Sequence, residues 1–243
     1  MRTLLETYRL RLRTFTPTDA EHIFALDNDP VVMRYINGGM STPRQVVEEQ
    51  ILSTFLRYDE HFPGFGFWAA IQKATSDFVG WFVFRPREGD PQAIALGYRF
   101  RTAAWGKGYA TEGAQALIDR GFAEWGVARV LATTYEENRA SRRVMEKLGM
   151  RHVRSFRYSA EEIGASDTSY TESPEVWDGE DVEYALTRAE WENQGAKNGF
   201  HIRPYRSADA DAVSDIIRRT MRISNSVDYS LEQLQLLIRL GAK

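Results

Sequence analysis

The chain has 243 residues, of which 43% are hydrophobic and 27% charged, an ordinary composition for a globular protein of one large domain, or of one domain and a fragment of another. The net charge of −3 gives no support for nucleic-acid binding or for a basic membrane-binding surface. The absence of cysteine excludes disulfides, thiolate zinc sites and a cysteine nucleophile, and the four histidines show no metal-ligand spacing.

The N-terminal 13 residues carry four arginines and no apolar segment, so they do not have the pattern of a signal peptide. No apolar run approaches the roughly 20 residues that a membrane-spanning helix needs. We therefore expect a cytoplasmic protein without nucleic-acid or membrane partners.

The first part of the chain predicts strands and two amphipathic helices. Residues 9–15 alternate as a strand, and Thr16, Pro17 and Asp19 then give a helix N-cap, a first-position proline and a first-turn acid. A second helix start at 41–43 precedes four apolar residues at helical spacing, which are Val47, Ile51, Phe55 and Leu56. Two aromatic-rich strands are expected at 67–72 and 78–84.

The remainder of the chain alternates strands with helices, which predicts an α/β sheet with parallel pairing where a helix intervenes. Gly149 is expected to end the second helix of this part. The expected strands are 94–100, 127–135, 152–158 and 182–186, and the expected helices are 111–125 and 141–148.

A loop with two glycines follows the strand at 94–100, and residues 104–113 read Ala-Trp-Gly-Lys-Gly-Tyr-Ala-Thr-Glu-Gly. Glycines before a helix allow backbone amides to converge on a phosphate group. A nucleoside-triphosphate P-loop needs four residues between its first glycine and the Gly-Lys pair, and this loop lacks that spacing. A dinucleotide fingerprint needs glycine or alanine where Thr111 stands.

Together with the strand at 127–135 and residues 138–150, this loop resembles the acetyl-CoA site of the GNAT superfamily of N-acetyltransferases. The nearest resemblance is to the RimJ/RimL-like branch, which acetylates N-terminal amino groups of ribosomal proteins, and it covers residues 8–191. It implies an α/β fold with a mixed, mostly antiparallel sheet and helices on both faces. It also implies a splayed parallel strand pair, 94–100 and 127–135, that holds the pantetheine arm.

The resemblance implies acetyl-CoA as cosubstrate, with no metal. Amides of 105–110 would bind the pyrophosphate, and an amide near Tyr98 or Phe100 would polarise the thioester carbonyl. Ser141 is the expected catalytic residue, because it matches the position that protonates the departing thiolate. Asn138 matches an asparagine that holds the cofactor arm, and it is also a candidate helix N-cap. The full set expected to contact the cosubstrate is Tyr98, Phe100, Trp105, Gly106, Lys107, Gly108, Tyr109, Ala110, Thr111, Asn138 and Ser141.

Two positions depart from the family pattern. Trp105 replaces the usual Gln or Arg, and we expect its ring to pack the loop. Ala95 replaces a glutamate that many relatives offer as a general base. Either another group serves, or little base catalysis is needed; the unranked candidates are Tyr135, Glu136, His22 and Glu112.

The expected reaction is direct transfer of acetyl from acetyl-CoA to a primary amine. An α-amine of pKa about 8 is roughly 10% neutral at pH 7, against about 0.04% for lysine, so loss of a base favours a low-pKa acceptor such as a protein N-terminus. The alternatives are a small-molecule amine acetyltransferase, acting on a polyamine, amino acid or antibiotic, and a catalytically weak acyl-CoA-binding module. A homodimer is left open.

We expect a catalytic domain at 1–192, a linker at 193–199 and a truncated second GNAT-like unit at 200–243. The last prediction rests on a repeat in which residues 202–211 align with residues 12–21. The connector at 161–183 holds nine acids and no Lys or Arg, and it is either a solvated loop or a lip that attracts a cationic amine.

Overall fold

The structure is a computed structural model that describes residues 2–61, 64–87, 90–157, 179–197 and 214. The chain divides into two units, Met1–Gly199 and Phe200–Lys243. The description below concerns the first unit, and the predicted second GNAT-like unit lies outside the described residues apart from Ser214.

The first unit is built on a sheet of eight strands in the order β1-β2-β3-β4-β5-β6-β8-β7. Neighbouring strands are antiparallel except for the parallel pair β5 and β6, so the predicted mixed, mostly antiparallel sheet is confirmed. The strands are β1 (Thr3–Glu6), β2 (Leu10–Arg13), β3 (Gly66–Gln72), β4 (Phe78–Arg87), β5 (Asp90–Phe100), β6 (Arg129–Tyr135), β7 (Arg151–Phe156) and β8 (Asp181–Thr187).

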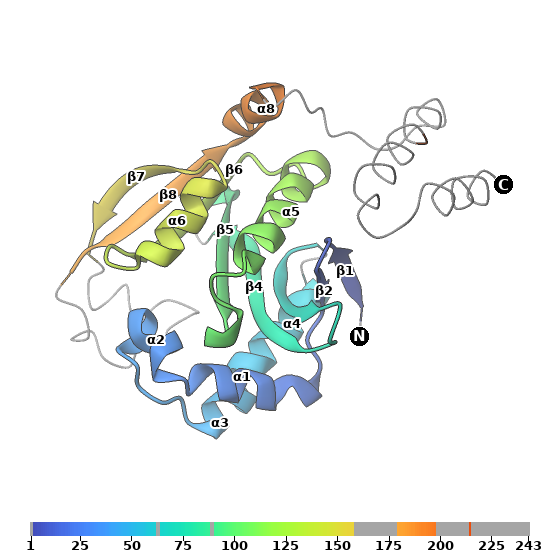
Figure 1. Cartoon of the computed structure of the whole chain (residues 1–243), viewed down its shortest axis with the longest axis vertical. Coiled ribbons are helices and arrows are strands. Elements are labelled where there is room, and N and C mark those ends of the chain that lie inside the picture. The colour runs from blue at the N-terminus through green and yellow to red at the C-terminus, as the bar shows by residue number, and fades with distance from the viewer. Residues whose placement is uncertain (1, 62–63, 88–89, 158–178, 198–213, 215–243) are drawn as a thin grey trace, which may run out of the picture. The chain divides into compact units, whose positions relative to one another are not determined.

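Helices cover both faces of this sheet (Figure 1). The helical elements are η1 (Pro17–Asp19), α1 (Ala20–Asp27), α2 (Pro30–Asn37), α3 (Arg44–Val46), η2 (Val47–Leu52), α4 (Ser53–His61), η3 (Thr102–Ala104), α5 (Tyr109–Glu124), α6 (Arg139–Lys147) and α8 (Arg188–Lys197). None of the helices in the described part of the chain has both the length and the apolarity to cross a bilayer.

Two cores form because strand residues alternate between the faces. In β3, Trp68 and Ala70 pack into the core beneath α5 and α6, whereas Phe67 and Ile71 pack into the core beneath α1 and α4. The core beneath α5 and α6 includes Ile94 and Leu96 of β5 and Val130 and Ala132 of β6, and it thereby supports the two strands that carry the candidate site.

Several predicted boundaries need correction. The strand expected at 9–15 is the shorter β2, and β1 before it was missed. Helix α2 was also missed, although Asp29 is its N-cap and accepts hydrogen bonds from the amides of Val31 and Val32. The predicted N-cap at Thr16, with Pro17 and Asp19 in the first turn, is confirmed, and Thr16 and Asp19 also form a capping box that was not predicted.

At the C-terminal end, helix α8 runs through residues 193–197, which were expected to be linker. The division of the chain at Gly199 nevertheless falls where the sequence repeat was expected to begin. Most of the acidic connector, residues 161–178, lies outside the described residues.

Candidate active site

Strands β5 and β6 pair over only three positions and then part. The paired residues are Ala93 with Arg129, Ile94 with Val130 and Ala95 with Leu131. Beyond them, β5 continues to Phe100 and remains paired with β4, while β6 continues to Tyr135 and remains paired with β8. The facing edges of 96–100 and 132–135 therefore do not pair with each other, as the predicted splay requires.

The amides of Tyr98 and Phe100 point into this split. The amide of Arg101 donates to Val79 O in β4, at 3.0 Å, and amides along a strand point to alternate edges. Because Arg99 and Arg101 direct their amides toward β4, those of Tyr98 and Phe100 face the opposite edge. That edge can therefore donate hydrogen bonds to a ligand lying between the two strands.

The glycine loop lies at the end of β5, where it leads into α5. Gly106 and Gly108 have φ values of 72° and 80°, in the left-handed region that favours glycine, and residues 105–108 are all exposed. A Cβ on Gly106 would meet nothing within 4 Å, so the space beside the loop is open. Gly108 is the N-cap of α5 and provides no side-chain cap, which leaves the first amides of the helix available to an anion. The loop therefore fits a pyrophosphate group.

An ion pair that the sequence did not reveal holds this loop in place. Arg9, between β1 and β2, donates from Nη1 to Lys107 O at 2.8 Å and from Nε to Glu112 Oε2 at 2.6 Å. Glu112 also accepts from the Thr7 hydroxyl at 2.5 Å and from the Arg9 amide at 2.8 Å. Burial alone would raise the pKa of Glu112, but the hydrogen bonds from Thr7 and Arg9 outweigh burial and lower it.

Trp105 differs from the expectation that its ring packs the loop. Its Nε1 donates to Phe100 O at 2.8 Å and so ties the loop to the end of β5, but the residue is 47% exposed. The side chains of Phe100 and Tyr109 lie in the core, so these residues can offer a ligand only their backbone. Because α5 begins at Tyr109, two residues earlier than predicted, Ala110 and Thr111 lie in its first turn.

Ser141 lies in the first turn of α6, opposite Tyr98. The Tyr98 hydroxyl is 3.0 Å from Ser141 Oγ and donates to Ser141 O at 3.1 Å. Burial raises the pKa of Tyr98 to about 12, against a smaller lowering by Ser141, so the phenol stays protonated. Asn138 is confirmed as the N-cap of α6: its Oδ1 accepts from the Ser141 amide at 3.2 Å, and its Nδ2 donates to Thr134 at 3.1 Å.

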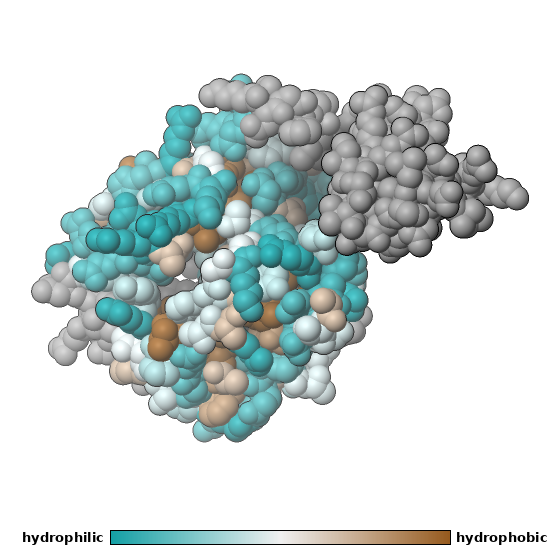
Figure 2. All heavy atoms as spheres, viewed as in Figure 1, coloured by the Kyte–Doolittle hydropathy of each residue, from teal (hydrophilic) through white to brown (hydrophobic). Residues whose placement is uncertain are grey.

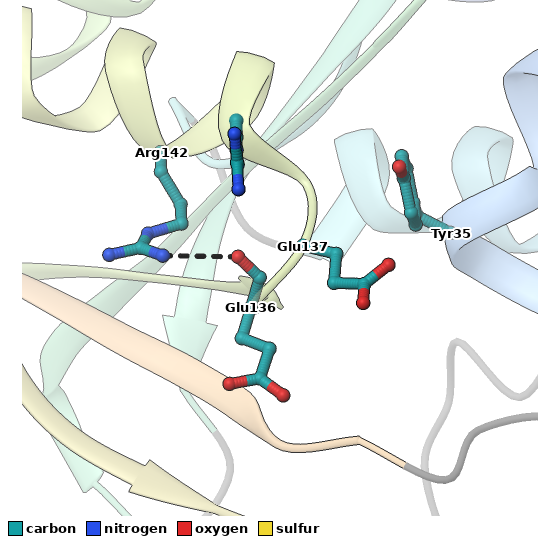
Figure 3. Close-up of a pocket in the computed structure, with 5 residues that line it drawn as sticks. Tyr35, Glu136, Glu137 and Arg142 are labelled. Atoms are coloured by element: carbon teal, nitrogen blue, oxygen red, sulfur yellow. Dashed lines mark hydrogen bonds between the residues drawn. The ribbon is translucent and has the colours of Figure 1, made fainter.

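A pocket of about 590 Å³ opens beside the start of α6, lined by Tyr35, Glu136, Glu137, Arg139 and Arg142. Figure 3 shows Tyr35 of α2 facing Glu137 across it, and the Arg142 guanidinium donating to the backbone oxygen of Glu136 at 3.1 Å. The Tyr35 ring stacks on that of Tyr135, with centroids 5.9 Å apart. This volume lies within the range for small-molecule sites. Figure 2 shows that the neighbouring surface of α6 is mostly hydrophilic.

Comparison with known proteins decides the family. Residues 9–151 match the sequence profile of the Acetyltransferase (GNAT) domain. The chain is 34% identical over 197 residues to the "FsC-acetyl coenzyme A-N(2)-transacetylase" of Aspergillus fumigatus, a match that covers 77% of each chain. The chain belongs to the GNAT acetyltransferase family.

Solved structures agree with this assignment. A GNAT-family acetyltransferase from Bacillus anthracis superposes with a TM-score of 0.62 at 26% identity, covering 76% of this chain and 98% of the other. The fold is also shared with RimL, a ribosomal L7/L12 alpha-N-protein acetyltransferase solved with coenzyme A. That superposition has a TM-score of 0.61 at 14% identity and covers 76% of this chain and 98% of RimL. The chain is thus an acetyl-CoA-dependent N-acetyltransferase, and its assignment to the RimJ/RimL-like branch stays a prediction.

The candidate bases of this GNAT enzyme lie in different places. Glu112 is committed to Arg9, and His22 stacks on Phe78 beside Arg101, where burial and the arginine lower its pKa. Of the four candidates only Glu136 lines the pocket, and Tyr135 stacks on the pocket residue Tyr35. Within the described residues no cluster of three His, Asp or Glu side chains could hold a metal ion.

Proposed function

We propose that this enzyme transfers acetyl to a low-pKa primary amine, for which a protein N-terminal α-amine is the first candidate. The observation that carries the proposal is the split between β5 and β6, with the amides of Tyr98 and Phe100 along one edge and the Ser141 hydroxyl opposite Tyr98. An acyl group held in that split would lie between carbonyl-polarising donors and a proton donor.

Each end of the site then has a role. The exposed amides of 105–110 and the N-terminus of α5 would hold the pyrophosphate of acetyl-CoA, and the edges of β5 and β6 would hold its pantetheine arm. Acetyl-CoA supplies an activated thioester as the acyl donor. The Tyr98 and Phe100 amides would stabilise negative charge on the carbonyl oxygen as the amine attacks.

Ser141 would give its hydroxyl proton to the departing thiolate. The single proton of the Tyr98 phenol can be donated either to Ser141 O or to Ser141 Oγ, and in the second arrangement the serine proton is free to point toward the leaving sulfur. The free CoA thiol has a pKa of about 8.5, so the help is useful without being indispensable. With no cysteine to carry an acyl group, transfer is direct.

The size of the pocket beside α6 supports an acceptor that is a small molecule, or a polypeptide of which only the N-terminal end enters the pocket. One relative is named for N(2) transfer to FsC and a structural neighbour for alpha-N acetylation of a protein. A small-molecule amine is therefore the second candidate, and a weak acyl-CoA-binding module is the alternative without turnover.

An acceptor screen tests the proposal. Because the protein has no cysteine, CoA release can be followed with a thiol reagent without background from the enzyme. The panel contains short peptides with different first residues, free amino acids, polyamines and Nα-blocked lysine. We expect turnover with α-amines and little with blocked lysine at pH 7; binding of acetyl-CoA without turnover of any acceptor would favour the weak binding module.

A matched pair of variants tests the cosubstrate site. Gly106 and Gly126 both have positive φ, 72° and 67°, and a Cβ on either would meet nothing within 4 Å, but only Gly106 lies in the loop. Gly106→Val and Gly126→Val should therefore carry similar strain. We expect only Gly106→Val to weaken acetyl-CoA binding in calorimetry, by tenfold or more. Equal affinities would place the pyrophosphate elsewhere.

A further inference from the structure

The face of the sheet opposite α5 and α6 carries an acidic residue on β8, which is one strand away from the split. Directly opposed residues of paired strands share a face. Asp181 of β8 opposes Tyr135 of β6, which lies four residues beyond Leu131 on the same face as Ala95 of β5. Tyr135 in turn stacks on Tyr35 of α2, so this is the face that α2 covers beside the pocket.

Carboxylates on this face are held by arginines, with one exception. Glu183 is 5% exposed and pairs with Arg87 at 2.6 Å and with Arg154 at 3.1 Å. Asp27 is fully buried and pairs with Arg99. Asp181 is half-buried, yet within the described part of the chain no hydrogen bond or ion pair joins its carboxylate.

Burial without a partner raises the pKa of Asp181 to about 6. The ionisable groups around it are Tyr135 from β6, Tyr35 from α2, Glu136, and Glu183 with its two arginines. The arginines are engaged by Glu183, so the charge of Asp181 remains uncompensated. A desolvated carboxylate beside a ligand pocket is poised to meet a cation and to take its proton near neutral pH.

The backbone holds Glu180, the residue before Asp181, next to the pocket-lining residue Glu136. The amide of Glu136 donates to Glu180 O at 2.9 Å, and the amide of Glu180 lies 3.4 Å from the Glu136 carboxylate. The first residue of β8 is thereby fixed next to a pocket-lining residue. The ring of Tyr135 lies against Gly179, two residues before Asp181, since a Cβ on Gly179 would lie 2.1 Å from the Tyr135 hydroxyl.

We propose that Asp181 binds the ammonium group of the acceptor and accepts its proton, as the general base of this acetyltransferase. The proposal rests on the proposed function and supplies the base that the sequence left open at Ala95. The proton passes from the ammonium nitrogen to Asp181, and the neutral amine forms the C–N bond with the acetyl carbonyl carbon. The C–S bond then breaks and the thiolate takes the Ser141 proton; the amide nitrogen gives its surplus proton back to Ser141, and Asp181 releases its proton to water.

The size of the expected effect follows from the acceptor. An α-amine of pKa about 8 is roughly 10% neutral at pH 7, so an enzyme that can use only the neutral amine has a kcat/KM about tenfold lower. Asp181→Asn should therefore lower kcat/KM about tenfold at pH 7. The kcat/KM of the variant should then rise with pH in proportion to the neutral fraction of the acceptor amine, and approach the wild-type value above about pH 9.

The experiment measures kcat/KM from pH 5 to 9.5 for wild type and Asp181→Asn, with the best acceptor of the screen. Glu180→Gln serves as the charge-matched control, because it removes a carboxylate from the adjacent residue. Wild type and control should share an acidic limb near pH 6 that Asp181→Asn lacks. Acetyl-CoA affinity, measured by calorimetry, should be the same in all three proteins.

The outcomes separate the two proposals. Absence of turnover in wild type with every acceptor overturns the proposed function. Normal wild-type turnover with an unchanged profile in Asp181→Asn overturns the role of Asp181 alone. A loss that is equal at every pH also overturns it, because such a loss marks a packing role rather than proton transfer.

Discussion

Two carboxylates of the catalytic domain, Glu112 beside the glycine loop and Asp181 beside the pocket, occupy opposite environments. Glu112 accepts hydrogen bonds from Thr7 and from the backbone and side chain of Arg9, which lower its pKa. Asp181 has no such donors among the described residues, and burial raises its pKa to about 6.

The difference shows how one residue type serves two purposes in a single site. Where the ligand is to be held by backbone amides, the carboxylate works as a structural anchor and stays ionised. Where a proton is to be moved, the carboxylate is left unpaired and its pKa rises toward neutrality. Each prediction below alters one side of this comparison, and they run from the largest expected effect to the smallest.

Removing the charge of Glu112 should have the largest effect. Glu112→Gln weakens hydrogen bonds to a charged acceptor and leaves Arg9 without its counterion, so the free energy of unfolding should fall by about 2 kcal/mol. Glu124→Gln, which breaks an exposed pair with Arg120 on the same helix, should change it by less than about 0.5 kcal/mol. Urea unfolding measures both.

The pH dependence of that loss has a definite sign. Because the folded-state pKa of Glu112 is lowered, its stabilisation is present above the unfolded pKa of about 4.3 and is lost as the pH falls through the folded value. Wild type and Glu112→Gln should therefore converge in acid. A constant difference down to pH 2 would contradict the role of the ionised carboxylate.

The proposed proton donor, Ser141, comes next. Ser141→Ala should lower kcat about tenfold with little change in the KM for acetyl-CoA, because a leaving-group donor acts in the transition state. If Tyr98 acts through Ser141, then Tyr98→Phe should add nothing to the serine variant. A double mutant that loses activity additively would show that Tyr98 has a separate role.

Loosening the loop without removing charge should have a smaller effect. Arg9→Lys keeps the cation but cannot bridge Lys107 O and Glu112 together, so the Kd for acetyl-CoA should rise about fivefold. Arg11→Lys, which alters the exposed pair with Glu6 in the same hairpin, is the control. Calorimetry that finds the two variants equal would show that the loop keeps its geometry without Arg9.

The smallest effect concerns the stability of Asp181→Asn, because solvent at the partly exposed carboxyl screens much of the free energy that the raised pKa implies. A raised folded-state pKa means that ionisation of Asp181 opposes folding, a penalty absent below about pH 4 and complete above about pH 6. The asparagine variant should therefore become the more stable protein as the pH rises from 4 to 6, and keep that small advantage at higher pH. Thermal unfolding of both proteins at several pH values measures this difference. A wild type that is more stable than the variant at pH 6 and above would contradict the prediction, because the ionised carboxylate would then have a stabilising partner.

The features that could be predicted from the sequence are local ones. The glycine loop and the N-caps at Thr16 and Asn138 depend on residues within a few positions of one another, and each is found where expected. The sheet and its split followed from the resemblance that those local signals carried.

The missed features depend on contacts between distant segments. Arg9 and Glu112 are joined across the fold, and no spacing in the sequence indicates such a pair. Asp181 belongs to a run of acidic residues that is more simply explained as a solvated loop. Nothing in the sequence distinguishes it from Glu183 in the same run, and the two are placed only by the pairing of β8 with β6. The proposed acceptor site could not be predicted from the sequence, because its side chains come from α2, β6 and β8, which lie far apart in the chain.

The three-residue junction between β5 and β6 has a consequence beyond catalysis. The two halves of the sheet share few backbone hydrogen bonds at this junction. A ligand that hydrogen-bonds to the unpaired edges of β5 and β6 therefore contributes to the free energy of folding. At a hundredfold excess over Kd, such linkage is worth about 2.7 kcal/mol. The lifetime of the enzyme, and not only its rate, would then follow the supply of acetyl-CoA around it.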